Sequence, residues 1–159
     1  MKNKILKVPK TEKEVSLWVN PDGMVKGSLF LLEQSHEHAG QEEPIEVLNQ
    51  ESPFVVVRLH NPEQLRFYNR TSIIRVEYPH RDSGEKVGKQ TIIPCTIYMM
   101  DGSILEGKIH ETFPPERARL FDYLNKEKSR FIRLYLSDTE VCLINKAFIN
   151  YVSPADEAS

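Results

Sequence analysis

The chain has 159 residues, with 21 Lys and Arg against 23 Asp and Glu, which leaves a formal net charge of -2. Apolar residues make up 40% and charged residues 28%, a composition that excludes an intrinsically disordered chain. The nearly balanced charge also excludes a protein that coats nucleic acid through bulk positive charge. The length fits one ordinary domain or two small ones.

The first predicted element is a strand over 15–19, in which Val15, Leu17 and Val19 alternate with Ser16 and Trp18. Asp22-Gly23 predicts a tight hairpin turn, because glycine adopts a positive φ without steric strain. A second strand follows this turn. Gly27 inside that strand is typical of a bulge, or of the sharp bend at which a small barrel turns a corner.

The next segment, 34–43, is polar and is expected to be a mobile loop, and 44–49 is a short, acidic stretch of helical character. Further strands are expected at 54–59, 65–68 and 73–78, because these runs are short, apolar and rich in β-branched or aromatic residues. Segment 80–90 has the composition of a linker.

The second part of the chain repeats the first. Segment 95–109 reproduces the strand, the Asp-Gly turn and the Gly-containing strand of 15–29. Leu124-Asn125 before 131–136 matches Leu48-Asn49 before 54–59, and 145–152 matches 69–76. The matches occur in the same order at offsets of 76 to 80 residues, which indicates a tandem duplication. The second repeat also predicts a helix over 114–125, with Pro115 in its first turn, and strands over 131–136, 141–144 and 148–152.

Five short strands within about 65 residues predict a strongly bent sheet that closes on itself. The predicted fold is therefore mainly β, with two tandem five-stranded barrels at 12–79 and 91–154, joined by a linker at 80–90. Each barrel is expected to have a short helix or loop inserted between its second and third strands. Residues 1–11 and 154–159 are expected to be frayed tails.

The order of the strands and of the turn residues between them resembles the Sm-like fold, a five-stranded bent barrel of the SH3-like type. The first motif of that family corresponds to 15–29 and 95–109. The second motif, a polar pair followed by the last strand, corresponds to 69–76 and 145–152. Sm proteins have Arg-Gly at the polar pair, where it helps to hold a nucleotide, whereas this chain has Asn69-Arg70 and Asn145-Lys146. The Leu-Asn and Phe-Ile-Arg-Leu pattern also resembles a group of short bacterial proteins of unknown function, which implies no activity.

The sequence contains no Gly-x-Ser-x-Gly, P-loop, Gly-x-Gly-x-x-Gly or His-Glu-x-x-His motif. We therefore expect no enzyme activity, small-molecule substrate, cofactor or metal site. His36 and His38 lie in the polar loop and are expected to be solvated, and Asp22 and Asp101 are expected to form turns.

The remaining features suggest a compartment. There is no apolar run long enough for a secretory signal or for a membrane span of about 18 residues. Cys95 and Cys142 lie in apolar strand-like runs without a Cys-x-x-Cys spacing, so reduced core thiols are expected. These observations favour a cytoplasmic protein.

Two functions remain open. The leading one is a non-enzymatic interaction or assembly module, in which open sheet edges pair with a protein partner or with further copies. The alternative, which the Sm resemblance implies, is binding of single-stranded RNA. Within 116–133, aromatic residues that can stack on bases are interleaved among six basic residues, although the same pattern fits a solvated helix face. The candidate RNA-binding residues are Asn69, Arg70, Asn145, Lys146, Arg117, Arg119, Lys128 and Arg130.

Overall fold

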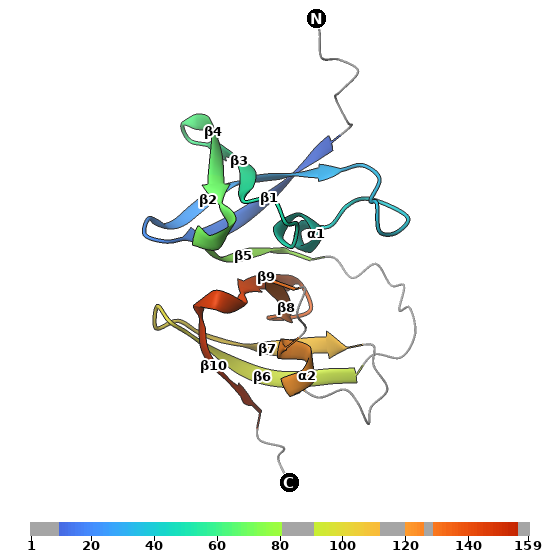
Figure 1. Ribbon diagram of the computed structural model, residues 1–159, viewed down its shortest axis with the longest axis vertical. Coiled ribbons are helices and arrows are strands. Elements are labelled where there is room, and N and C mark those ends of the chain that lie inside the picture. The colour runs from blue at the N-terminus through green and yellow to red at the C-terminus, as the bar shows by residue number, and fades with distance from the viewer. Residues whose placement is uncertain (1–9, 81–90, 112–119, 126–128, 156–159) are drawn as a thin grey trace, which may run out of the picture.

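The computed structural model describes residues 10–80, 91–111, 120–125 and 129–155, and every structural statement below concerns these residues (Figure 1). They form a mainly β structure, which confirms the predicted class. The first half contains β1 (Lys10–Val19), β2 (Gly23–Leu32), α1 (Pro44–Leu48), β3 (Phe54–His60), β4 (Glu63–Asn69) and β5 (Ile73–Pro79). The second half contains β6 (Thr91–Met99), β7 (Ile104–Glu111), α2 (Leu120–Leu124), β8 (Phe131–Tyr135), β9 (Glu140–Asn145) and β10 (Ile149–Pro154).

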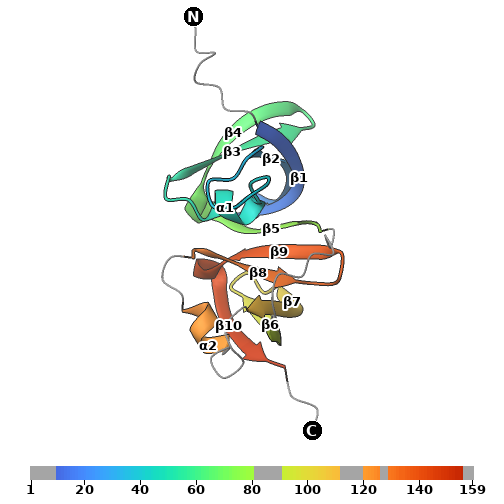
Figure 2. The same ribbon diagram turned by 90° about the vertical axis from the view of Figure 1, so that its right-hand side faces the viewer.

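All ten strands belong to one sheet with the order β10-β6-β7-β8-β9-β5-β1-β2-β3-β4 (Figure 2). The first half contributes the order β5-β1-β2-β3-β4, and the second half contributes the same order as β10-β6-β7-β8-β9. The registers also correspond, since Leu17 lies opposite Val76 and Ile97 lies opposite Val152. The two halves are therefore related by more than their sequence pattern.

The two halves, which the sequence predicts as tandem five-stranded barrels, are joined edge to edge. β5 pairs with β1 on one side and with β9 on the other, so the ten strands form a single open sheet. β9 is the fourth strand of the second half. The halves are thus continuous through backbone hydrogen bonds.

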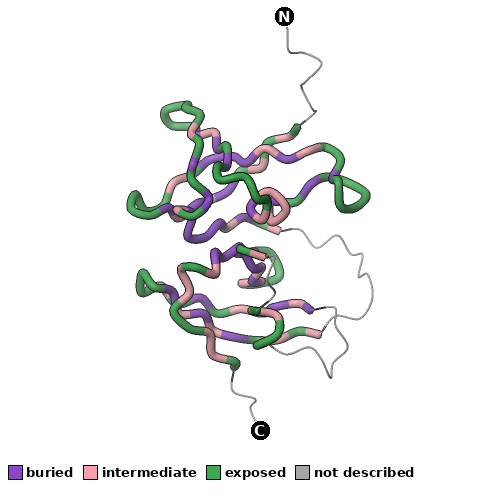
Figure 3. The backbone as a smooth tube through the Cα atoms, viewed as in Figure 1, coloured by how far each residue is buried: buried purple, intermediate pink, exposed green. Residues whose placement is uncertain are grey.

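The apolar core is also shared between the halves. Phe131, Val141 and Leu143 come from the second half, but they are fully buried in the core of the first. Ile74 comes from the first half and is buried in the core of the second. Figure 3 shows β5 and β9 as mostly buried segments facing each other across the junction. A domain of about 60 residues buries little core alone, so this sharing adds apolar burial that neither half could supply.

Gly23 and Gly102 have φ values of 87° and 90°, which confirms the two predicted hairpin turns. The interior glycines are not at bulges, because the β1–β2 and β6–β7 registers run unbroken past Gly27 and Gly107. A Cβ on Gly107 would lie 2.5 Å from the carbonyl oxygen of Tyr135, and one on Gly27 would lie 2.8 Å from that of Arg58. These glycines therefore permit the close approach of the third strand of each half.

The boundaries of several elements differ from the predicted ones. β1 begins at Lys10, so Lys10 and Thr11 belong to a strand and not to a frayed tail. Helix α1 confirms the short helical stretch. Only the end of the predicted second helix, Leu120–Leu124, lies in the described part of the chain. Of the predicted linker at 80–90, only His80 lies in the described part of the chain.

Cys95 and Cys142 are both buried and free, as expected from the sequence. Burial raises the pKa of the Cys95 thiol to about 11, and it raises that of Cys142 as well. Neither thiol is therefore activated for nucleophilic chemistry. Within the described residues, no helix has the length and apolar character needed to cross a membrane.

Candidate functional site

The junction between the halves is built on the antiparallel pairing of β5 and β9. Its register begins with Arg75 opposite Ile144 and ends with Pro79 opposite Glu140. Beyond that pair, the backbone N–H of His80 donates to the carbonyl of Thr139 at 2.7 Å. The ladder fixes the relative position of the two halves along the strand direction.

Two asparagine side chains add hydrogen bonds across this junction. Asn49 follows α1, and its amide makes two bonds to the backbone of Phe131 in the other half. Its Oδ1 accepts from the Phe131 N–H at 2.7 Å, and its Nδ2 donates to the Phe131 carbonyl at 3.2 Å. Buried Asn145 donates from Nδ2 to the carbonyl of Ile73 at 3.0 Å, while its Oδ1 accepts from the Ala147 N–H. Asn145 therefore adds a bond beyond the Arg75–Ile144 end of the ladder, and Asn49 holds the start of β8.

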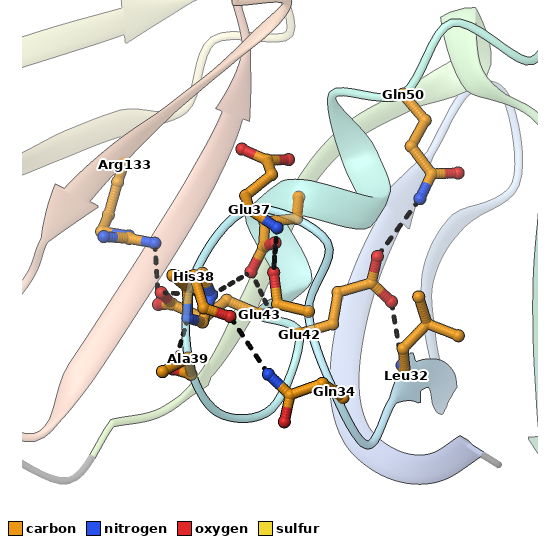
Figure 4. Close-up of polar contacts among 11 residues, drawn as sticks. Leu32, Gln34, Glu37, His38, Ala39, Glu42, Glu43, Gln50 and Arg133 are labelled. Carbon is orange, nitrogen blue, oxygen red and sulfur yellow. Dashed lines mark hydrogen bonds and ion pairs between the residues drawn. The ribbon is translucent and has the colours of Figure 1, made fainter.

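An ion pair also crosses the junction beside the loop that precedes α1 (Figure 4). Arg133 Nη2 on β8 lies 3.1 Å from Glu43 Oε1. Glu43 is the N-cap of α1, and its backbone N–H donates to Glu46 Oε2 at 2.7 Å in a capping box. The same Glu46 carboxylate accepts the hydroxyl of Ser35 at 2.6 Å. The loop is therefore tied to α1 and, through Arg133, to the second half.

His38 completes this cluster. Its Nε2 lies 2.7 Å from Glu46 Oε2, and its Nδ1 lies 2.8 Å from the carbonyl oxygen of Ala39. Because both ring nitrogens face oxygens that only accept, the doubly protonated imidazolium is favoured. The Ala39 carbonyl and the Glu46 carboxylate accordingly raise the pKa of His38. Ligand atoms of His38, Glu43 and Glu46 lie within 4.8 Å of one another, but the capping box and Ser35 already occupy both Glu46 oxygens.

Arg70 is not available to a nucleic acid, because its side chain is only 1% exposed. Its Nε donates to the carbonyl of Ser52 at 2.7 Å, and its Nη1 donates to the carbonyls of Val47 and Leu48 at 2.6 and 2.8 Å. Its Nη2 donates to the Ser52 hydroxyl at 2.9 Å. The predicted RNA contact is therefore replaced by a structural role, in which Arg70 satisfies carbonyls at the end of α1.

The structure brings Asn145, Lys146 and Arg130 together on a cleft between the halves. Asn145 is buried, Lys146 is half-buried with its Nζ 3.1 Å from the Leu124 carbonyl, and Arg130 is exposed. The cleft has a volume of about 530 Å³. It is lined by Asn49, Gln50, Glu51, Thr71, Leu124, Asn125, Ser129, Arg130, Asn145, Lys146 and Ala147.

Asn69 is a described candidate that does not join this group. Asn69 is exposed outside the cleft, where its Oδ1 accepts from the Thr71 N–H at 2.9 Å. Arg117, Arg119 and Lys128 lie outside the described residues. The cleft therefore gathers three of the five candidates that the structure describes.

The two ends of the sheet are the other prominent surface. β4 is at one end and β10 at the other, and no described strand pairs with the outer side of either. In Figures 1 and 2 these two strands lie in opposite halves of the molecule. Large apolar side chains are exposed here, although open sheet edges are ordinarily protected by charge. They are Phe54, Val56, Leu65, Phe67 and Tyr151.

The shared strand order matches each outer residue to one at the junction. The β3–β4 and β8–β9 registers match Phe54 with Phe131, Leu65 with Val141, and Phe67 with Leu143. The three junction residues are 0% exposed, whereas Phe54, Leu65 and Phe67 are 53%, 50% and 66% exposed. The first half thus presents to solvent an apolar edge whose counterpart is buried by the other half.

Comparison with protein-family models, with curated proteins and with solved structures finds no match to this chain. The function must therefore be argued from the geometry of the junction, the cleft and the outer edges.

Proposed function

We propose that this chain is a non-enzymatic assembly module, made of two Sm-like barrel units, whose copies join head to tail. In this arrangement β10 of one copy pairs with β4 of the next, as β5 pairs with β9 inside the chain. The observation that supports the proposal is the contrast between buried Phe131, Val141 and Leu143 and their exposed apolar counterparts.

The internal ladder predicts the register between copies. Arg75 opposite Ile144 corresponds to Tyr151 opposite Tyr68, and Val76 opposite Leu143 corresponds to Val152 opposite Phe67. A junction of this kind joins two different surfaces, so each copy keeps one free end for the next. Repetition yields a closed ring where the rotation between copies closes and a filament where it does not.

The energetics favour such a contact. Burying a large apolar side chain contributes about 1.5–3 kcal/mol, and the outer edge offers several of them beside unpaired backbone groups. Association must offset lost translational and rotational freedom, which the internal junction avoids because its halves are covalently linked. The copy–copy junction is therefore weaker than the internal one and depends on protein concentration.

The decisive experiment compares Phe67→Glu with the wild-type chain in sedimentation velocity over a concentration series. A charge at the centre of the edge should weaken association roughly 30-fold, as for the loss of a central interface residue. Ile104→Glu is the matched control, since Ile104 is 60% exposed but lies beside the β6–β7 turn. A wild-type chain that stays monomeric throughout, or a Phe67→Glu variant that assembles like wild type, would contradict the proposal.

A second candidate function is binding of single-stranded RNA in the cleft. It is supported by exposed Arg130, which lines the cleft beside Lys146 and the exposed amide of Asn125. Oligo-U and oligo-A binding should then weaken as salt rises, and Arg130→Glu should lower the affinity for both. Lys26→Glu is the control, because Lys26 is exposed on β2 outside the cleft. Affinity no better than millimolar at low salt, or equal effects of both variants, would exclude this function.

A further inference from the structure

The residues that form the Asn49 clamp at the internal junction have matching residues elsewhere in the chain. Asn49 follows Leu48 at the end of α1, and Asn125 follows Leu124 at the end of α2. Asn125 is exposed, and its Nδ2 donates to the Phe121 carbonyl at 2.8 Å within its own helix. The second half thus has an exposed asparagine, in the lining of the cleft, at the position where the first half uses one to hold its neighbour.

The backbone that such a clamp would hold is also present. Asn49 binds the N–H and C=O of Phe131, and the residue matching Phe131 is Phe54. In both halves the residue after the fourth strand bonds the residue before the third: Lys146 N–H donates to the Arg130 carbonyl, and Arg70 N–H donates to that of Pro53. Because antiparallel ladders alternate, the N–H and C=O of Phe54 face away from β4, as those of Phe131 face away from β9.

A second pair of matching asparagines supports the same arrangement. Asn145 caps Ala147 with its Oδ1 and reaches the Ile73 carbonyl with its Nδ2. Its counterpart Asn69 caps Thr71 with its Oδ1 in the same way, and its Nδ2 has no partner among the described residues. The residue matching Ile73 is Ile149, the first residue of β10.

We propose that Asn125 of one copy clamps the backbone of Phe54 in the next copy, while Asn69 of that next copy donates to the Ile149 carbonyl of the first. This inference rests on the proposed head-to-tail assembly and adds the groups that set its register. The apolar side chains of the edge tolerate sliding, because apolar attraction is not directional. A two-point amide bond to one peptide unit does not tolerate it, so the asparagines select a single register.

The test uses Asn125→Ala and Asn49→Ala as a matched pair, with association and unfolding measured for each. Asn125→Ala should weaken association roughly tenfold through the loss of two hydrogen bonds and leave the urea midpoint of the monomer unchanged. Asn49→Ala should do the opposite, lowering the urea midpoint without a specific effect on association. Asn125→Asp keeps the acceptor for the Phe54 N–H but loses the donor, so its association should lie between those of alanine and wild type.

The outcomes separate the clamp from the assembly itself. If the wild-type chain assembles and Phe67→Glu disrupts it while Asn125→Ala does not, the clamp is wrong and the assembly stands. If the wild-type chain does not assemble, both are wrong. Circular dichroism of Asn125→Ala reports any loss of α2. If α2 is lost, Asn69→Ala provides the second measurement, and an unchanged association constant in that variant overturns the proposal.

Discussion

At the scale of single residues, interior hydrogen bonds decide which polar side chains remain available. Arg70 and Lys146 occupy matching positions in the two halves, yet Arg70 is 1% exposed and Lys146 is half-buried. The guanidinium satisfies two backbone carbonyls of α1 and both oxygens of Ser52. Arg70 therefore stabilises the fold of the first half.

We expect Arg70→Ala to lower the free energy of unfolding by about 2–4 kcal/mol, because one buried and two part-buried carbonyls lose their donor at once. Lys146→Ala should cost less than Arg70→Ala, since Lys146 is only half-buried. Urea denaturation followed by circular dichroism measures both. Equal stability losses would contradict the structural role of Arg70.

His38 should titrate above the ordinary histidine range, because the Ala39 carbonyl and the Glu46 carboxylate raise its pKa from 6.5. A raised folded-state pKa stabilises the loop fully below pH 6.5, and that contribution is lost as the pH rises through the folded-state pKa. An NMR titration measures the shift in the wild-type chain. In Glu46→Gln, which removes the charge and keeps one acceptor oxygen, the pKa should return toward 6.5. A titration unchanged by this substitution would contradict the His38–Glu46 pairing.

At the scale of elements, alternation of apolar residues located most strands, since a period of two marks a half-buried strand wherever it lies. It did not reveal that β1 begins at Lys10, because that end of the strand is polar. Nor did it indicate that β5 pairs with β9, because the pattern fixes which face is buried and says nothing of which edges meet. The Leu-Asn repeat was visible in the sequence, but only the structure shows that Asn49 binds Phe131 across the junction.

The interior glycines should be more sensitive to substitution than the turn glycines. In Gly107→Ala the new Cβ meets the Tyr135 carbonyl and the Leu134 side chain, so β8 must shift, at a cost of about 1–3 kcal/mol or more. In Gly102→Ala no atom lies within 4 Å of the new Cβ. Only the positive φ is unfavourable, at about 1 kcal/mol. Thermal unfolding of the two variants provides the comparison. A larger loss in Gly102→Ala would argue against close packing of β7 on β8.

At the scale of the whole molecule, the shared sheet and shared cores make the halves mutually dependent. Leu143 and Phe131 are covalently part of the second half but complete the core of the first. Trp18 belongs to the first half but packs against the core of the second, with the Arg75 guanidinium 3.9 Å from its ring. Neither half can therefore unfold without exposing core of the other.

We accordingly expect one cooperative unfolding transition and not two. Trp18 is the sole tryptophan, so its fluorescence reports the junction, while far-ultraviolet circular dichroism reports all ten strands. The two urea curves should coincide. Leu143→Ala should lower the free energy of unfolding by about 2–5 kcal/mol and shift both curves together, because it opens a cavity in the shared core.

Phe67→Ala is the matched control for Leu143→Ala, because Phe67 occupies the same position in the first half but is 66% exposed. Measured at concentrations where the chain is monomeric, it should change stability by no more than about 0.5 kcal/mol. Separate transitions by the two probes, or a Leu143→Ala effect confined to one of them, would contradict mutual dependence. Coincident shifts would instead mean that the internal junction is a permanent part of the fold, leaving the β4 and β10 edges as the ones open to association.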